Sequence, residues 1–152
     1  NEMDDFSSKP GFPNAYGLVG NVANAIEPGK RMLSSMSPTI IENSTGNLYM
    51  VIGSPGGSTI ITTTAQIIMN VVDFKMNIED AVEEKRFHHQ WIPDMIQIEE
   101  MGFSIETITQ LKSMGHEFKT RSSIGEANCI LVEDGFIYGA ADSRRNSSAL
   151  GY

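Results

Sequence analysis

The sequence of 152 residues has almost no cysteine, no long apolar run and no cluster of basic residues. Cys129 is the only cysteine, so no disulfide can form within the chain, and its place in the apolar run CILV favours burial over nucleophilic chemistry. No stretch approaches the roughly eighteen consecutive apolar residues of a membrane-spanning helix. The formal charge is -8 and the 11 basic residues are scattered, which argues against a nucleic-acid partner.

The apolar pattern predicts an α/β (α+β) domain whose elements follow a long irregular segment at residues 1–36. A segment of that length without secondary structure usually serves a function or is disordered, and its content favours function. The predicted strands cover 37–42, 47–53, 95–99, 117–121, 127–133 and 136–141, and the predicted helices cover 59–74, 78–87 and 105–114. Asn77 and Ser104 can cap the second and third helices. Helices are too few to cover both faces of one sheet, so we expect part of a larger fold.

The stretch GSPGGS at residues 53–58 stands directly before the first predicted helix. A glycine-rich turn between a strand and a helix exposes successive backbone N–H groups, and the helix dipole favours negative charge there. Phosphate binding fits poorly, because the spacing is neither GxGxxG nor that of a P-loop. Two interpretations remain: a tight turn without a ligand, and an oxyanion hole for acyl transfer.

Acidic and hydroxyl side chains cluster in the irregular segment. NEMDDF contains Glu2, Asp4 and Asp5, of which Glu2 and Asp5 can enter one site if the chain turns between them. Two carboxylates suit an ammonium group, whereas Ser34 and Ser35, near basic residues, can hold a carboxylate. The alternatives are a solvated acidic terminus and serines that cap turns. No GxSxG motif surrounds Ser34, so we do not predict it to be a nucleophile.

Four stretches together resemble a known family: residues 1–40, GSPGGSTIITT at 53–63, RFHHQWIPD at 86–94 and YGAADSRR at 138–145. They look like the C-terminal part of the small subunit of γ-glutamyltranspeptidases (glutathione hydrolases), over nearly the whole chain. The resemblance implies part of an N-terminal-nucleophile hydrolase, an αββα sandwich. In that family, autoproteolysis cuts a precursor into large and small subunits and leaves a threonine nucleophile at the new N-terminus.

The resemblance also implies roles for individual residues. Asp5, with Glu2, would receive the α-ammonium of a γ-glutamyl group, and the Ser34-Ser35 pair would hold its α-carboxylate. The Gly56-Gly57 pair would supply backbone N–H groups to the oxyanion. Residues 1–36 would then be substrate-pocket loops, and 37–152 the sheet and helices of the same partial small-subunit domain. The nucleophilic threonine would lie upstream of Asn1, so we expect this chain alone to be inactive, because this chemistry uses the nucleophile's own α-amino group as the base.

Substrates and partners follow from the same resemblance. We expect a γ-glutamyl transferase and hydrolase that acts on glutathione and related γ-glutamyl amides through a γ-glutamyl-enzyme intermediate, without a cofactor. The acceptor would be water, an amino acid or a peptide, and the protein partners would be the large subunit of the same precursor and the chain's own upstream segment. Family resemblance alone suggests a periplasmic, secreted or cell-surface location. The alternatives are an amidase or acylase of the same fold and a non-catalytic γ-glutamyl-binding module.

Two further features bear on the site. Adjacent His88 and His89 point in different directions, and no third ligand stands at a suitable spacing, so we predict packing beside Phe87 and Trp91 rather than a metal site. The chain also departs from the usual family motifs, which read GSPGGSR, RPLSSM, APRFHHQW and DPR. Local differences are therefore expected at Thr59, Met32, Glu84, Lys85 and Ser143.

Overall fold

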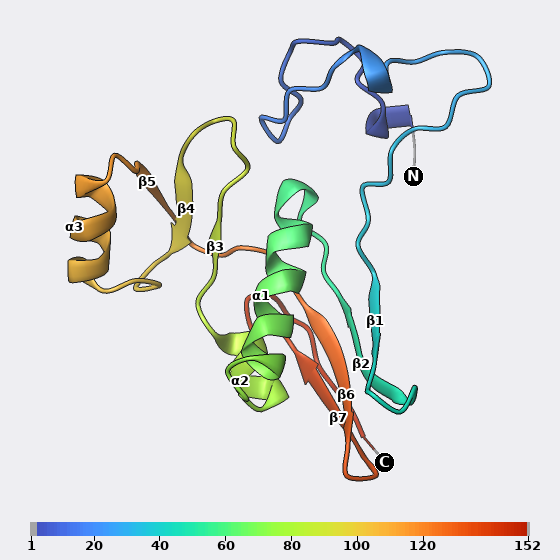
Figure 1. The fold of residues 1–152 in the computed structure, drawn as a ribbon, viewed down its shortest axis with the longest axis vertical. Helices are drawn as coiled ribbons and strands as arrows, with labels where there is room; N and C mark the ends of the chain where they lie inside the picture. The colour runs from blue at the N-terminus through green and yellow to red at the C-terminus, as the bar shows by residue number, and fades with distance from the viewer. Residues whose placement is uncertain (1–2, 152) are drawn as a thin grey trace.

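The computed structural model describes residues 3–151 and contains two β-sheets (Figure 1). The larger sheet is antiparallel with strand order β1-β2-β6-β7, and the smaller has the order β3-β4-β5 with β4 and β5 parallel. The strands are β1 (Thr39–Glu42), β2 (Leu48–Gly53), β3 (Phe87–His88), β4 (Ile96–Glu99), β5 (Phe118–Arg121), β6 (Asn128–Glu133) and β7 (Phe136–Ala141).

Helices α1 (Ile60–Val72) and α2 (Ile78–Glu83) pack against one face of the four-stranded sheet, whereas α3 (Ile105–Ser113) lies beside the smaller sheet (Figure 1). The predicted caps are confirmed: the Asp80 N–H donates to Asn77 Oδ1 and the Thr107 N–H donates to Ser104 Oγ. Both caps satisfy N–H groups that a helix start leaves without partners.

The hydrophobic core lies between the four-stranded sheet and helices α1 and α2. Alternate residues of β2 and β6 face these helices because side chains of a strand alternate between its two faces. The core comprises Met50, Ile52, Ile67, Val71, Ile78, Ala81, Val82, Ala127, Cys129, Leu131 and Ala140. The predicted burial of Cys129 is confirmed, and burial raises its pKa to about 12, so the thiol is not poised as a nucleophile.

The opposite face of this sheet is apolar and, apart from a contact of Ala149 beside Gly139, not covered by the described chain. Ile40 pairs with Val51, and Val51 pairs with Ile130, so the three side chains form a row across three strands. Ile40 is 70% exposed and Ile130 is 44% exposed. The expectation that helices cover only one sheet face is confirmed.

Two sequence predictions were wrong in detail. The elements form two sheets rather than one, and the predicted helix 78–87 ends at Glu83. Glu84 adopts φ -56° and ψ 145°, which leaves the helical region, and Phe87 and His88 then pair with β4 as β3. The short β3 has no alternating pattern long enough to read from sequence.

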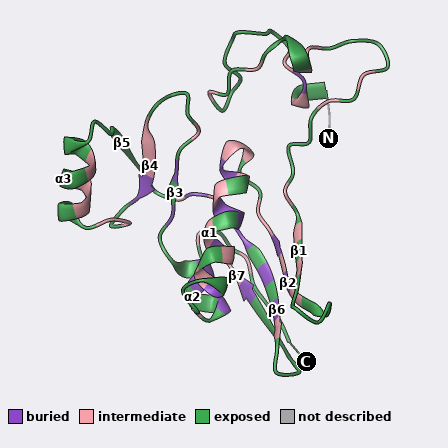
Figure 2. Ribbon diagram, in the orientation of Figure 1, coloured by how far each residue is buried: buried purple, intermediate pink, exposed green. Residues whose placement is uncertain are grey.

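Residues 3–36 contain no strand within the described chain, and their regular structure is limited to the short 3-10 helices η1 (Met3–Asp5) and η2 (Val22–Asn24). Figure 2 shows that this segment is mostly exposed, whereas the buried residues gather on the four-stranded sheet, on its helices and on the adjoining parts of β3 and β4. Phe6, at 8% exposure, is its one buried apolar residue. No helix among residues 3–151 is long and apolar enough to cross a membrane.

Candidate functional site

The GSPGGS turn leaves β2 and enters α1 through a third 3-10 helix, η3 (Gly57–Thr59). Gly56 and Gly57 both have positive φ, 141° and 57°, which favours glycine at these positions. The Gly56 carbonyl accepts hydrogen bonds from the Thr59 N–H (3.1 Å) and from Thr59 Oγ1 (3.0 Å). Because the C=O and N–H of a trans peptide point in opposite directions, this clamp aims the Gly57 N–H away from Thr59.

The backbone N–H groups of Gly56 and Gly57 donate to no acceptor found among residues 3–151. Helix α1 follows directly, is 13 residues long and has no acidic residue in its first turn, so nothing there neutralises the positive end of its dipole. Figure 1 shows that this end points toward the segment 3–36. The geometry suits an oxyanion, and the assignment of Gly56 and Gly57 to one stays a prediction.

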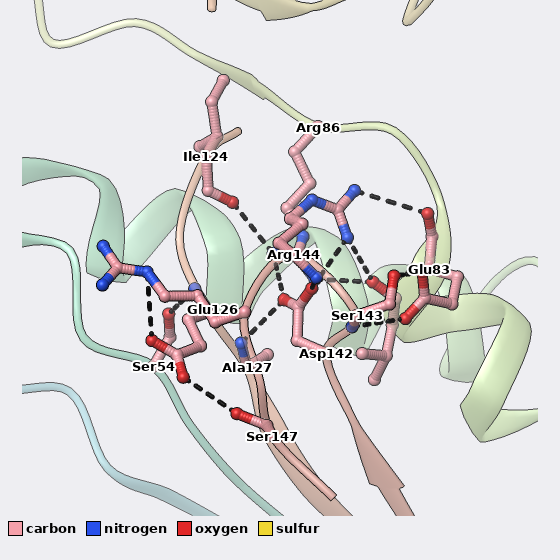
Figure 3. A network of polar contacts seen from close by, with 12 residues as sticks. Ser54, Glu83, Arg86, Ile124, Glu126, Ala127, Asp142, Ser143, Arg144 and Ser147 are labelled. Atoms are coloured by element: carbon pink, nitrogen blue, oxygen red, sulfur yellow. Dashed lines mark hydrogen bonds and ion pairs between the residues drawn. The ribbon is translucent and has the colours of Figure 1, made fainter. Parts of the chain in front are cut away.

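The other half of the turn is fixed by the β5–β6 connection (Figure 3). Ser54 Oγ accepts from the Glu126 N–H at 3.0 Å and donates to the Pro55 carbonyl at 2.7 Å. Glu126 in turn accepts a hydrogen bond from Ser147 Oγ at 2.8 Å. The start of the turn is therefore held by residues far along the chain.

Tyr16 packs against Gly57, and the sequence alone did not reveal this contact. A side-chain carbon added to Gly57 would lie 2.5 Å from Tyr16 Cε1. The Tyr16 carbonyl accepts from Gln90 Nε2 at 3.0 Å, and Gln90 Oε1 lies 2.9 Å from His88 Nε2. An isolated tyrosine in an irregular segment carries no spacing signal, and only the folded chain places it on the glycine turn.

Asp5 and the residue before Ser34 are joined by the side chain of Asn24. Asn24 Nδ2 donates to the Asp5 carbonyl at 2.7 Å, and the Leu33 N–H donates to Asn24 Oδ1 at 3.2 Å. The structure therefore brings together the two segments that contain Asp5 and the Ser34-Ser35 pair. Glu2 lies outside the described residues.

The side chains of the serine pair are exposed. Ser34 Oγ accepts from the Met36 N–H at 3.3 Å and lies 3.4 Å from the Met36 carbonyl, to which it donates. These contacts are long, so a ligand carboxylate can replace them at little cost. The binding roles of Asp5, Ser34 and Ser35 stay predictions.

A hollow of about 470 Å³ lies between residues 36–38, which follow the Ser34-Ser35 pair, and the GSPGGS turn. Its walls come from the residues just before β1, the end of β2 with the two residues after it, and the first residues of α1 and β6. The lining residues are Met36, Ser37, Pro38, Gly53, Ser54, Pro55, Ile60 and Asn128. The candidate residues Asp5, Ser34, Ser35, Gly56 and Gly57 are not among them, so the hollow adjoins the candidate site on the sheet side.

The two histidines differ in environment. His88 is 2% exposed, and its Nδ1 lies 2.8 Å from Thr62 Oγ1. His89 pairs with the exposed Asp94 at 3.0 Å. Trp91 is 78% exposed, so the predicted packing against it was wrong, whereas His88 is buried as expected. In the described part of the chain no three His, Cys, Asp or Glu side chains form a metal-binding group.

A buried ion network ties the end of α2 to the end of β7 (Figure 3). Through Glu99 the same network reaches β4. Arg86 binds Asp142 at 2.7 Å, and Arg144 contacts both carboxylate oxygens of Glu99 at 2.6 Å. Ser143, one of the departures from the family motifs, hydrogen-bonds Glu83 through its N–H and its hydroxyl. The network encloses the 124–127 loop, which in turn holds Ser54.

The carboxylates of this network stay ionised in the fold. Burial alone would raise the pKa of Glu99, but hydrogen bonds from Arg144 and from two backbone N–H groups outweigh it and lower the pKa. Burial likewise opposes ionisation of Asp142, and bonds from the Ala127 and Arg144 N–H groups and from Arg86 lower its pKa. The ion pairs raise the pKa of Arg144.

The sheet with helices on one face and an apolar opposite face is part of the αββα sandwich of N-terminal-nucleophile hydrolases. A cephalosporin acylase from Bacillus halodurans shares this fold, with a TM-score of 0.73 at 22% identity over 85% of this chain and 25% of that chain. The chain belongs to the gamma-glutamyltranspeptidase family, whose model matches residues 1–152.

Two relatives show how similar the chain is to members of this family. The glutathione hydrolase proenzyme of Escherichia coli (strain K12) is 50% identical over 145 residues, which cover 95% of this chain and 25% of that protein. A mutant of Helicobacter pylori gamma-glutamyltranspeptidase has a TM-score of 0.89 and 50% identity over 95% of this chain and 80% of that chain. The chain thus spans about 25% of the length of the curated relative.

Proposed function

We propose that this chain supplies the donor-binding residues and the oxyanion hole of a γ-glutamyl transferase and hydrolase acting on glutathione and related γ-glutamyl amides. Asp5 binds the α-ammonium of the donor, Ser34 and Ser35 bind its α-carboxylate, and Gly56 and Gly57 face the γ-carbonyl oxygen. The observation that carries the proposal is the Asn24 bridge between Asp5 and Leu33, because a donor head needs both partners side by side.

The chemistry is a two-step acyl transfer to a threonine outside this sequence. The threonine hydroxyl attacks the γ-carbonyl carbon, its proton passes to the threonine's own α-amino group, and the amine leaves with that proton as the C–N bond breaks. Water or an amine acceptor then attacks the ester carbon and releases the threonine. In both steps the carbonyl oxygen gains negative charge, which the N–H groups of Gly56 and Gly57 stabilise.

The proposal also includes the protein partners that would cover the apolar face of the four-stranded sheet. The apolar row of Ile40, Val51 and Ile130 suits a second sheet that the upstream segment and the large subunit of the same precursor would contribute. Support comes from the family and from the exposure of this face, since monomeric proteins rarely leave contiguous apolar patches uncovered.

Replacing Asp5 by Asn in the complete, self-processed protein tests the proposed function. The KM for glutathione should rise roughly ten- to 150-fold with little change in kcat, because a charge-assisted contact worth about 1.5–3 kcal/mol is lost. Asp4→Asn is the matched control: it removes the neighbouring charge, which lies on an exposed side chain, and should leave KM within about twofold.

An unchanged KM in Asp5→Asn would contradict the donor-binding assignment. Equal turnover of glutathione and of a glutaryl amide without the α-ammonium and α-carboxylate would point to an acylase instead. Retention of labelled γ-glutamyl compound without turnover by the processed wild-type protein would indicate a binding module.

A further inference from the structure

Asn24 contacts both donor-binding segments with one planar amide group. Its Nδ2 reaches the Asp5 carbonyl, 19 residues away, and its Oδ1 receives the Leu33 N–H, 9 residues away. The two contacts fix which amide atom faces which segment, because only the NH2 group can donate to a carbonyl and only the oxygen can accept from an N–H. Leu33 directly precedes Ser34.

The main chain of Asn24 adds a third contact to the same region. Its carbonyl accepts from the Ser7 N–H at 2.8 Å, and Ser7 and Ala25 form an isolated parallel β-bridge. The approach is close at Gly20, where an added side-chain carbon would lie 2.1 Å from Ser7 Oγ. The chain segment 5–7 therefore packs closely against residues 20–25 and is hydrogen-bonded to them.

Polar contacts rather than a core determine the shape of this segment. Phe6 is its single buried apolar residue in the described chain, so apolar packing contributes little to the spacing of its loops. Asn24 itself is half-buried, where a hydrogen bond competes less with water than at a fully exposed site. Loss of the amide would leave the Asp5 and Leu33 segments free to separate.

We propose that Asn24 is a positioning residue that sets the distance between the ammonium site at Asp5 and the carboxylate site at Ser34-Ser35. This inference rests on the proposed function. Both donor groups sit on one α-carbon, so the two protein sites must keep a separation that a single amino-acid head can span. Asn24 thereby makes the site selective for donors that carry both groups.

The test compares Asn24→Ala with Asn21→Ala in the complete, processed enzyme. Asn21 is the matched control because its amide oxygen only caps η2, accepting from the Ala23 N–H at 2.8 Å. Asn24→Ala should raise the KM for glutathione about tenfold while kcat stays within about threefold, since hydrogen bonds that pre-organise the binding segments are lost. Asn21→Ala should change the KM less than about twofold.

Asn24→Asp supplies a second variant that keeps the side-chain volume and the acceptor for Leu33. It places a carboxylate oxygen against the Asp5 carbonyl, so it should fail to restore the KM. If Asn24→Ala does not yield processed enzyme, this variant carries the test. A KM equal to wild type in Asn24→Asp, or equal shifts for Asn24 and Asn21 variants, would overturn the inference.

A double-mutant cycle with Asp5→Asn separates this inference from the proposed function. If Asn24 acts through Asp5, then Asn24→Ala should add less than about threefold to the KM of Asp5→Asn. If the effects of the two substitutions on the KM are instead fully additive, the positioning role is overturned. An Asp5→Asn enzyme with a normal KM would instead contradict the proposed function.

Discussion

At Gly57 the folded chain leaves no room for a side chain. An added carbon would meet the Tyr16 ring at 2.5 Å, and the residue has φ 57°. The Thr59 clamp on the Gly56 carbonyl fixes the intervening peptide, so a displaced Gly57 carries its N–H group with it. Small errors in the aim of such a donor reduce its effect on the transition state.

We therefore predict that Gly57→Ala in the complete, processed enzyme lowers kcat by roughly a hundred- to a thousandfold while the KM for glutathione changes little. Steady-state kinetics measure both values. Gly46→Ala is the control, because Gly46 has φ 80° but nothing within 4 Å of an added carbon, so it tests backbone strain alone. A normal kcat in Gly57→Ala would mean that the GSPGGS stretch is only a turn.

Some residues of the candidate site can be recognised from the local sequence, whereas others are recognised only by their contacts in the folded chain. Composition and position located the glycine pair in a turn between a strand and a helix, as the structure has it, whereas its role toward an oxyanion stays a prediction. Tyr16, Asn24 and Gln90 could not, because their contacts join residues up to 74 positions apart and depend on a fold the local pattern does not encode. The sequence marked Thr59 as a departure from the family motif, but it did not predict the hydrogen bonds of Thr59 to the Gly56 carbonyl.

At the scale of elements, the ion network explains why α2 ends where it does. Three carbonyls at its C-terminal end, those of Val82, Glu83 and Glu84, accept N–H groups of the Arg144 guanidinium. Cations at a helix C-terminus stabilise it, and these bonds satisfy carbonyls that the last turn leaves unpaired. The helix predicted from the sequence continued past Glu83 because Glu84 and Lys85 suit a helix. In the structure the contacts of the distant Arg144 determine where α2 ends.

The same network makes stability depend on pH. Because the pKa values of Glu99 and Asp142 are lowered in the fold, their contribution to the free energy of unfolding is complete above the ordinary carboxyl pKa of about 4. It is lost as the pH falls through their pKa values in the folded state. Asp142→Asn should lower the free energy of unfolding at pH 7 by about 3–5 kcal/mol, since it leaves Arg86 buried without its ion-pair partner.

Urea unfolding of the complete processed protein from pH 7 to pH 3 measures this effect. The variant should lose less stability than wild type over that range, because one of the two linked carboxylates no longer titrates. Asp94→Asn is the control: Asp94 is 89% exposed and should change stability by less than about 0.5 kcal/mol. Parallel pH profiles for wild type and Asp142→Asn would contradict the role of this ion pair.

For the whole molecule, the order of elements predicted that helices would leave one sheet face uncovered, and this is confirmed. The division into two sheets was missed, because strand pairing such as the parallel contact of β4 with β5 depends on partners about 20 residues apart rather than on local pattern. The long exposed segment 3–36 agrees with the expectation that this chain is part of a larger fold, since a chain folding alone would bury more of it.

The last prediction concerns the uncovered face. Ile130 lies on β6 between Val51 and Gly139 and points away from the core, so Ile130→Asp should leave the packing of α1 and α2 intact. If the proposed second sheet covers this face in the complete precursor, the aspartate would be buried there without a partner, at a cost of several kcal/mol. We expect little soluble, processed enzyme from this variant by gel electrophoresis and size-exclusion chromatography.

Ile105→Asp is the matched control, because Ile105 is 85% exposed at the start of α3, where an acid suits the helix dipole. Normal processing and assembly of Ile130→Asp would show that this face stays in solvent in the whole protein, and the proposed sandwich partner would have to bind elsewhere.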